Sequence, residues 1–259
     1  ILTVIPEQLN NPDFLMTANQ LSLGNALQQI ADNGGNGVTT ELQHLTTLGQ
    51  VRDAYDQLSG QTRTSLAFVS SSGNTGFTDT VSSRLNNTHS GVSMRFNDSP
   101  LFAMAAPASD APMYDTQRNL NSFAIGNGTA YFASENWGMW MRGYGIFGER
   151  DTEIGTTGYQ YRTYGSGFGM DFKTSKEFIL GITGGYSYGH VDYSSSRDES
   201  DITGTPMGIY GSWFSEGGYI DAILTYTPMK YETTRYVDLT SEKLEGDFDG
   251  FEAGTYWEL

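Results

Sequence analysis

The sequence predicts a mainly β protein: an antiparallel transmembrane β-barrel meander that is preceded by short α-helices. The first observation is the composition, because 32 Gly, 16 Tyr and 14 Phe occur with no Cys and with only 37% hydrophobic residues. The second is that large apolar and small or polar residues alternate after residue 131, which is the period of a strand. The third is that short turns and long polar loops alternate between these segments, as in outer-membrane barrels. A soluble acidic all-β domain is the alternative that composition leaves open.

Charge and hydropathy exclude several classes of protein. The 14 Lys and Arg residues face 30 Asp and Glu residues, which gives a formal net charge of -16. Nucleic-acid binding needs a basic surface, so no nucleic-acid partner is expected. The sequence contains no run of 18 apolar residues, so it predicts no transmembrane helix. The sequence begins with Ile1 and shows no signal peptide, so we expect the natural N-terminus to lie upstream.

Two amphipathic helices are predicted in the first quarter of the chain. Residues 17–32 place apolar residues at spacings of three and four, and Thr17 or Asn19 can cap this helix. Residues 39–58 repeat the spacing, and Gly49 is expected to break or bend the second helix. A turn rich in Gly and Asn joins the two segments, so they should pack as a hairpin around a small core.

The next two segments are more polar. Residues 61–89 favour a helix that is interrupted at 70–74 and is rich in Ser and Thr. Such a helix suits either a water-lined cavity or an ordinary surface. Residues 90–130 show no period and contain three Pro residues, which predicts a long loop or linker.

Six strand-like segments follow from residue 137. The clearest covers 178–189, where large apolar residues occupy even positions and small or polar residues occupy most odd ones. Segments near 167–172, 219–227 and 250–259 alternate in the same way, whereas 137–147 and 205–214 carry aromatic residues on both faces. The predicted tight turns are Ser175-Lys176 and 215–218, and the predicted long loops are 148–158, 192–204 and 237–247.

The alternation divides the strand residues into two faces. Charged residues fall on the small-residue face, and a charge that faces lipid is costly, so this face should line the lumen. The residues predicted to face the lumen are Gly167, Gly169, Asp171, Gly181, Thr183, Asp221 and Glu252. The residues predicted to face lipid are Phe168, Met170, Leu180, Ile182 and Leu224. Candidates for interfacial aromatic girdles are Trp137, Trp140, Trp213, Tyr186, Tyr188, Tyr226 and Trp257.

No constellation in the sequence predicts catalysis, a cofactor or a metal site. The three histidines, His44, His89 and His190, share no ligand spacing. Gly165-Ser166-Gly167 falls in a strand and lacks the strand-to-helix turn of a nucleophilic serine. Asn86-Asn87 is interpreted as the end of a helix, and the acidic clusters at 192–201 and 247–249 as solvated loops. Arg84 and Arg142 are candidate partners for the acidic residues of the lumen face.

Four blocks of sequence together resemble the C-terminal translocator region of the monomeric (type V secretion) autotransporters of Gram-negative bacteria. They are Ala-Tyr-Asp-Gln-Leu-Ser-Gly at 54–60, the segment from Asn136 to Gly145, Gly-Phe-Gly-Met-Asp at 167–171, and a hairpin made of 208–213 and 218–221. Their order and spacing carry the resemblance, which covers residues 15–259.

The resemblance implies an organisation for the whole chain. Residues 1–14 would end an upstream passenger or linker, 15–60 would form junction helices, and 61–89 would hold a helix in the barrel lumen, followed by a linker at 90–130 and the N-terminal half of the barrel domain at 131–259. The family barrel has about twelve strands. We therefore expect the first six of about twelve strands, open as given, with the chain truncated within the β-barrel at Leu259.

The same resemblance implies a function. The domain would insert into the bacterial outer membrane as a β-barrel and export its N-terminal passenger to the cell surface. Implied partners are outer-membrane lipid and lipopolysaccharide, the chain's own passenger in cis, the barrel-assembly machinery and periplasmic chaperones. The alternatives are a passenger-less outer-membrane channel or porin, which would have no need of the helices at 17–58, and a soluble β-rich adhesin module. Nothing in these residues predicts an enzyme.

Overall fold

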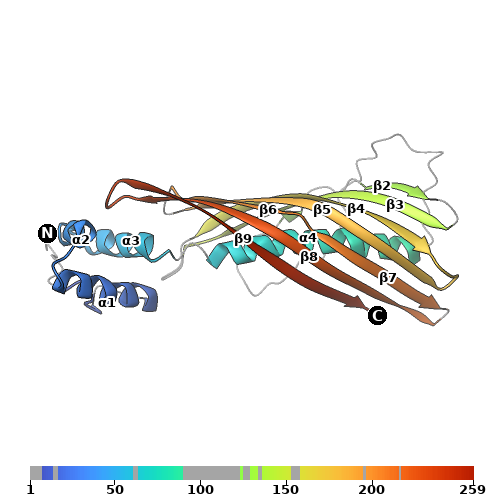
Figure 1. The fold of residues 1–259 in the computed structure, drawn as a ribbon, viewed down its shortest axis with the longest axis horizontal. Helices are drawn as coiled ribbons and strands as arrows, with labels where there is room; N and C mark the ends of the chain where they lie inside the picture. Colours follow the sequence, from blue (N-terminus) through green and yellow to red (C-terminus); the bar gives the residue numbers. More distant parts are fainter. Residues whose placement is uncertain are drawn as a thin grey trace.

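The computed structural model describes residues 8–13, 17–60, 64–89, 123–124, 129–133, 136–152, 158–194, 197–215 and 217–259. These residues form a small group of helices and a curved antiparallel sheet along which one long helix runs (Figure 1). Residues 1–7 and 14 of the predicted upstream segment at 1–14, and most of the predicted linker at 90–130, lie outside the described residues.

Three short helices come first in the chain: α1 (Ala18–Asp32), α2 (Gly37–Gln43) and α3 (Leu48–Ser59). Each begins with a capping box, in which the N-cap and N3 side chains accept hydrogen bonds from each other's backbone N–H. The N-cap residues are Thr17, Asn36 and Thr47. Each helix therefore carries its own start signal in the local sequence.

The helical stretch predicted over 39–58 is broken, as the sequence allows, but the position of the break differs from the predicted one at Gly49. The break falls at 44–47, before Gly49, since Thr47 caps a new helix there. Gly60 ends α3 in the left-handed conformation, with φ of 67°, which suits a glycine at a helix C-terminus.

The three helices share an apolar core, and we call residues 17–60 the N-terminal helical module. Leu27, Leu42, Val51 and Tyr55 are buried in this core. The Tyr55 hydroxyl donates a 2.5 Å hydrogen bond to the backbone carbonyl of Leu9. Burial raises the pKa of Tyr55 to about 12, because the phenolate would lose its hydration.

The fourth helix, α4 (Thr64–His89), is continuous over 26 residues, so the predicted interruption at 70–74 is wrong. Ser and Gly are weak helix formers, but tertiary packing overrides that preference. A Cβ atom at Gly73 would lie 3.4 Å from the Thr163 side chain, which shows how closely the helix meets the sheet. The buried apolar residues of α4 include Leu66, Val69, Phe77, Val81 and Leu85.

The sheet contains nine strands among the described residues, and every pair of neighbours is antiparallel. In chain order they are β1 (Phe123–Ala124), β2 (Thr129–Ala133), β3 (Trp137–Arg150), β4 (Tyr159–Lys173), β5 (Phe178–Tyr193), β6 (Glu199–Gly204), β7 (Met207–Ser215), β8 (Gly218–Val237) and β9 (Glu242–Glu258).

The strands follow one another as a meander, and all six predicted segments are strands. β6 and β7 lie end to end between β5 and β8, so together they occupy the place of one predicted strand. Thr205 and Pro206 separate them, because proline cannot donate to the ladder. β1 and β2 also pair with β3, although the sequence predicts only a linker where β1 lies. Among the described residues the sheet stays open, since β9 pairs with β8 alone.

The two ends of the sheet differ in how their strands are joined. At one end, tight turns join β4 to β5 and β7 to β8, as the sequence predicts. At the other end, the long loops predicted at 192–204 and 237–247 are mostly strand, because β5 reaches Tyr193 and β8 reaches Val237. β6 and β9 both pair with β8 there, as Glu199 with Thr234 and Glu242 with Val237 show, so backbone pairing continues through polar sequence. We call these the tight-turn end and the hairpin end.

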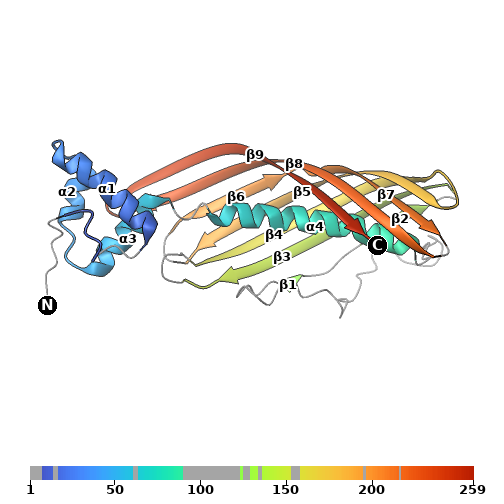
Figure 2. The ribbon, with the colours of Figure 1, turned by 90° about the horizontal axis from the view of Figure 1, so that it is seen from below.

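α4 lies along the concave face of the sheet (Figure 2). It contacts β3, β4, β5 and β8, among others. Leu66 near its start packs with residues of the hairpin end, and His89 at its end lies beside β7 and β8 near the tight-turn end. No described helix combines the length and the hydropathy that a bilayer-spanning helix requires.

Raising the pH should loosen the N-terminal helical module. The pKa of Tyr55 is raised from 10.0 to about 12, so its contribution to stability is complete below pH 10 and is lost as the pH rises through 12. Circular dichroism of the purified protein should show helix loss in this window. Tyr55→Phe should cost about 1 kcal/mol at neutral pH through the lost hydrogen bond, but it should lack the alkaline loss. A Tyr55→Phe profile that falls as steeply as the wild-type profile would contradict this account.

Candidate functional site: the inner face of the sheet and its helix

α4 covers one face of the sheet, and we call this the inner face. Asp171, Thr183 and Asp221 are buried there, with 4%, 8% and 1% of their surface exposed. The register places Asp171 opposite Gly181 and Gly169 opposite Thr183. All seven residues predicted to face the lumen lie on this face: Gly167, Gly169, Asp171, Gly181, Thr183, Asp221 and Glu252.

The opposite, outer face carries the five residues predicted to face lipid. Phe168, Leu180, Ile182 and Leu224 are each about half exposed or more, and Met170 is half-buried. Other large apolar residues extend this surface, among them Met139, Met141, Phe172, Met207, Ile209, Trp213 and Ile220. A continuous apolar surface of this kind marks contact with lipid or with another protein.

The apolar surface ends in aromatic residues toward the hairpin end. Tyr164, Tyr186 and Tyr226 are exposed there. Beyond them the outward residues are charged, such as Arg162 and Asp192, which form an exposed ion pair of 2.9 Å. This sequence of apolar, aromatic and charged residues resembles the profile of a membrane interface.

Trp140 is a correction to the predicted girdle, because it lies buried on the inner face with 3% exposure. The first strand carries aromatic residues on both faces, so its alternation did not decide the facing. The register with β4 decides it, by placing Trp140 opposite Gly169. A Cβ at Gly169 would lie 2.6 Å from the indole ring, so only glycine leaves room for it.

A buried ion pair joins the helix to the sheet. Arg84 of α4 donates from Nε and Nη2 to the two carboxylate oxygens of Asp171, at 2.8 and 2.9 Å. The Tyr210 hydroxyl donates to the same carboxylate at 2.9 Å, and Trp140 Nε1 donates to Tyr210 at 2.7 Å. A bidentate pair with further hydrogen bonds can offset the desolvation of two buried charges. Of the two arginines proposed as partners, the structure joins Arg84 to Asp171.

Further polar contacts follow the length of α4. The Ser65 and Tyr193 hydroxyls lie 2.6 Å apart, and Ser70 donates to Glu252 at 2.9 Å. Near the middle, Thr227 donates to the Asn74 side chain at 2.9 Å. The hydroxyl and amide side chains of α4 therefore find polar partners on the inner face of the sheet.

The C-terminal end of α4 reaches β7 and β8. His89 Nε2 lies 2.7 Å from Ser212 Oγ and 3.2 Å from Asp221 Oδ1. Its ring lies over Tyr219 with centroids 4.3 Å apart. One nitrogen faces both partners, so this is not the relay of a catalytic triad, in which the histidine uses two nitrogens.

Small residues allow this close packing. A Cβ at Gly167 would lie 2.5 Å from Thr80 Oγ1, and one at Gly76 would lie 2.6 Å from the Tyr144 ring. The Tyr144 hydroxyl in turn donates to the carbonyl of Gly73 at 2.9 Å. Glycines on both the helix and the sheet thus let side chains of one element pack directly against the backbone of the other.

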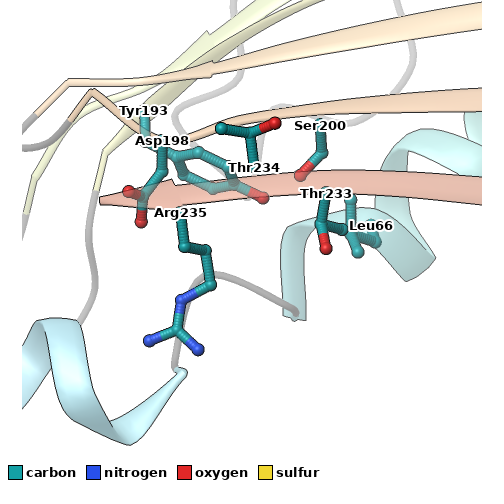
Figure 3. A pocket seen from close by; sticks show the side chains of 7 residues that line it. All are labelled: Leu66, Tyr193, Asp198, Ser200, Thr233, Thr234 and Arg235. Atoms are coloured by element: carbon teal, nitrogen blue, oxygen red, sulfur yellow. The ribbon is translucent and has the colours of Figure 1, made fainter. Parts of the chain in front are cut away.

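A shallow depression opens where α4 begins, at the hairpin end (Figure 3). It contains about 210 Å³ of empty space, part of it open solvent. Its walls come from α4, β5, β6 and β8 and from Asp198, and the lining residues are Leu66, Tyr193, Asp198, Ser200, Thr233, Thr234 and Arg235. No arrangement of nucleophile and base occurs among these side chains.

Within the described parts of the chain, no group of three or more His, Asp or Glu residues could hold a metal ion. His44 lies near Glu41, whereas His190 contacts Asp192 and Asp201 on the outer face. Ser166 lies within β4, and Asn86-Asn87 lies in the last turn of α4. The arrangement is that of a helix bound to a polar wall.

Sequence reasoning missed the tyrosines and the tryptophan that complete the inner face. Tyr144, Tyr210 and Trp140 are buried beside α4. The available signal was the glycine opposite each ring, namely Gly165, Gly181 and Gly169, because a large residue needs a small cross-strand neighbour.

Comparison with known proteins agrees with this geometry. Residues 139–259 match the family model described as "Autotransporter beta-domain". Outer membrane protein B of Rickettsia prowazekii (strain Madrid E) is 27% identical over 136 residues, which is 47% of this chain and 8% of the relative. The chain therefore spans less than a tenth of that protein's length. No solved structure matches the chain. The family match indicates the bacterial outer membrane as the location.

Removing Arg84 should destabilise the fold strongly. Arg84→Ala leaves the Asp171 carboxylate buried and unpaired, which costs about 3–5 kcal/mol. Arg162→Ala is the matched control, because its 2.9 Å pair with Asp192 is about half exposed and such pairs contribute about 0–1 kcal/mol. Urea unfolding of the detergent-solubilised protein measures both. Equal losses of unfolding free energy in the two variants would show that the buried pair stabilises the fold no more than the exposed pair does.

A larger side chain at Gly167 should push α4 away from the sheet. Gly167→Val would place Cβ 2.5 Å from Thr80 Oγ1, and overpacking of this kind costs about 1–3 kcal/mol. At Gly143, on the outer face, the nearest atom to a new Cβ would be 3.8 Å away, so Gly143→Val should be neutral. Limited proteolysis of α4 should be faster in the Gly167 variant only. The reverse order would place α4 on the wrong face.

Proposed function

Starting from the autotransporter β-domain family that residues 139–259 match, we propose that this chain is an outer-membrane translocator that exports its N-terminal segment to the cell surface. An autotransporter β-domain is a translocator and not a catalytic domain. The outer face would contact lipid, with Phe168, Met170, Leu180, Ile182 and Leu224 in the hydrocarbon region. The inner face, with Asp171, Asp221 and Glu252, would line the pore.

The observation that carries this proposal is the seated position of α4. The helix runs from the hairpin end to the tight-turn end with polar contacts along its length. The N-terminal helical module, which precedes α4 in the chain, lies at the hairpin end (Figures 1 and 2). Short turns face the periplasm in outer-membrane barrels, so the hairpin end would face the outside.

The same observation separates this proposal from a porin. A porin needs an open polar lumen, whereas α4 packs directly on the inner face here through Arg84 and Phe77. A soluble adhesin module would have to cover the apolar outer face by other means. Lipopolysaccharide, the barrel-assembly machinery and periplasmic chaperones are partners that the family implies for this proposal.

The orientation can be tested in cells that make the protein. An epitope inserted between Gly34 and Gly35, in the exposed turn between α1 and α2, should be reached by antibody and by protease on intact cells. The same epitope inserted between Ser175 and Lys176, in a tight turn, should be reached only after the outer membrane is permeabilised. Protection of the first site together with exposure of the second would overturn the proposed direction of export.

A further inference from the structure

The N-terminal helical module contacts the β8–β9 hairpin, and these contacts lie apart from those that hold α4 on the inner face. We infer that the module is a folded stop: it folds after it has left the pore, docks on the tip of the β8–β9 hairpin, and so keeps α4 seated. This inference rests on the proposed function, because it assumes that residues 17–60 reach the outside through the barrel.

Docking is specific because one side chain of α3 recognises the hairpin tip in two ways. Gln57 Oε1 accepts from the backbone N–H of Asp238 at 3.0 Å, and Gln57 Nε2 donates to Asp238 Oδ2 at 3.1 Å. Arg235 of β8 adds a hydrogen bond to the backbone carbonyl of Gln57. Together these bonds hold the last turn of α3 against the hairpin.

An apolar contact completes the docking surface. Leu239, at the hairpin tip, packs against the apolar core of the module, which contains Leu42, Val51 and Tyr55. The hairpin thus contributes a side chain to the module's own core. A neighbouring hairpin supports the tip, because Arg197 pairs with Asp238 at 3.0 Å and lies over the Tyr236 ring at 4.7 Å.

Size explains why a docked module would act as a stop. Packed helices lie about 8–10 Å apart, so the folded module is about twice as wide as a single helix. α4 already packs so closely on the inner face that neither Gly76 of the helix nor Gly167 of the sheet has room for a Cβ atom. The folded module therefore cannot follow α4 back along the inner face. Capping boxes on all three helices let it fold from local signals once it is outside.

Cross-linking tests the docking directly. The 259 residues contain no Cys, so introduced cysteines are unique within them. Ser59→Cys with Thr240→Cys should be joined by a short bis-maleimide on intact cells, because these positions lie two residues from Gln57 and Asp238 and leave the docking bonds in place. Glu41→Cys with Thr240→Cys is the control, because Glu41 lies exposed on α2, and it should remain unlinked. Failure of the first pair to cross-link in protein whose Gly34–Gly35 epitope is on the surface would overturn the docking while leaving export intact.

Labelling tests whether docking keeps α4 seated. Thr80 of α4 is 2% exposed, so Thr80→Cys should react slowly with an impermeant maleimide. Adding Leu239→Asp should raise the labelling rate at least about tenfold, which corresponds to about 1.4 kcal/mol in the unseating equilibrium. Adding Lys243→Ala, an exposed change in the same hairpin, should leave the rate unchanged.

Heat-modifiable migration on a gel verifies that each variant has a folded barrel. If Leu239→Asp fails this check, Gln57→Ala removes the two Asp238 bonds without adding a charge and should raise the labelling rate in the same direction. A folded variant that labels Thr80→Cys at the wild-type rate would overturn the stop. Loss of the Gly34–Gly35 epitope from the surface of the wild-type protein would instead overturn the proposed function.

Discussion

The structure depends on the buried contact between Arg84 and Asp171. α4 buries five apolar residues against the sheet, but such contacts are non-directional and do not by themselves fix how the helix is placed along it. A buried guanidinium needs a carboxylate partner, and a buried carboxylate needs a cationic partner. Arg84 and Asp171 therefore each offset the cost of burying the other. Tyr210 and Trp140 extend the pair into the sheet wall and tie helix and strands into one unit.

Close packing between unequal side chains is the second constraint. Several buried rings on the inner face stand beside a glycine of the neighbouring strand, as Trp140 does beside Gly169 and Tyr210 beside Gly181. Large residues therefore fill the inner face without pushing the strands apart. The outer face combines large and small residues in the same way, as Phe168 lies opposite Gly184 and Tyr164 opposite Gly145, but its apolar residues meet no further layer among the described residues and stay exposed.

The N-terminal helical module shows how a small domain can be supported by a larger one. Its core is small, and units of this size are weakly stable alone. Leu239 from the β8–β9 hairpin enlarges that core, and Gln57 is hydrogen-bonded to Asp238 at the hairpin tip. The stability of the module and the position of α4 are therefore linked through the β8–β9 hairpin. The strands of this hairpin extend into the segment 237–247, where the sequence predicts a loop.

The sequence by itself determined the strands, the shared faces of the strands with clear alternation, and the cap of the first helix, because period two, capping residues and turn residues are local signals. It offered Arg84 and Arg142 as candidate partners for the acidic residues of the small-residue face, and the structure pairs Arg84 with Asp171. Only the tertiary structure decided that α4 is continuous, that Trp140 faces inward, and that the polar segments at 192–204 and 237–247 continue as strands. In each of these cases a neighbour distant in sequence overrides the local preference: the sheet wall supports a helix rich in weak formers, the β4 register sets the facing, and an adjacent ladder extends a polar strand.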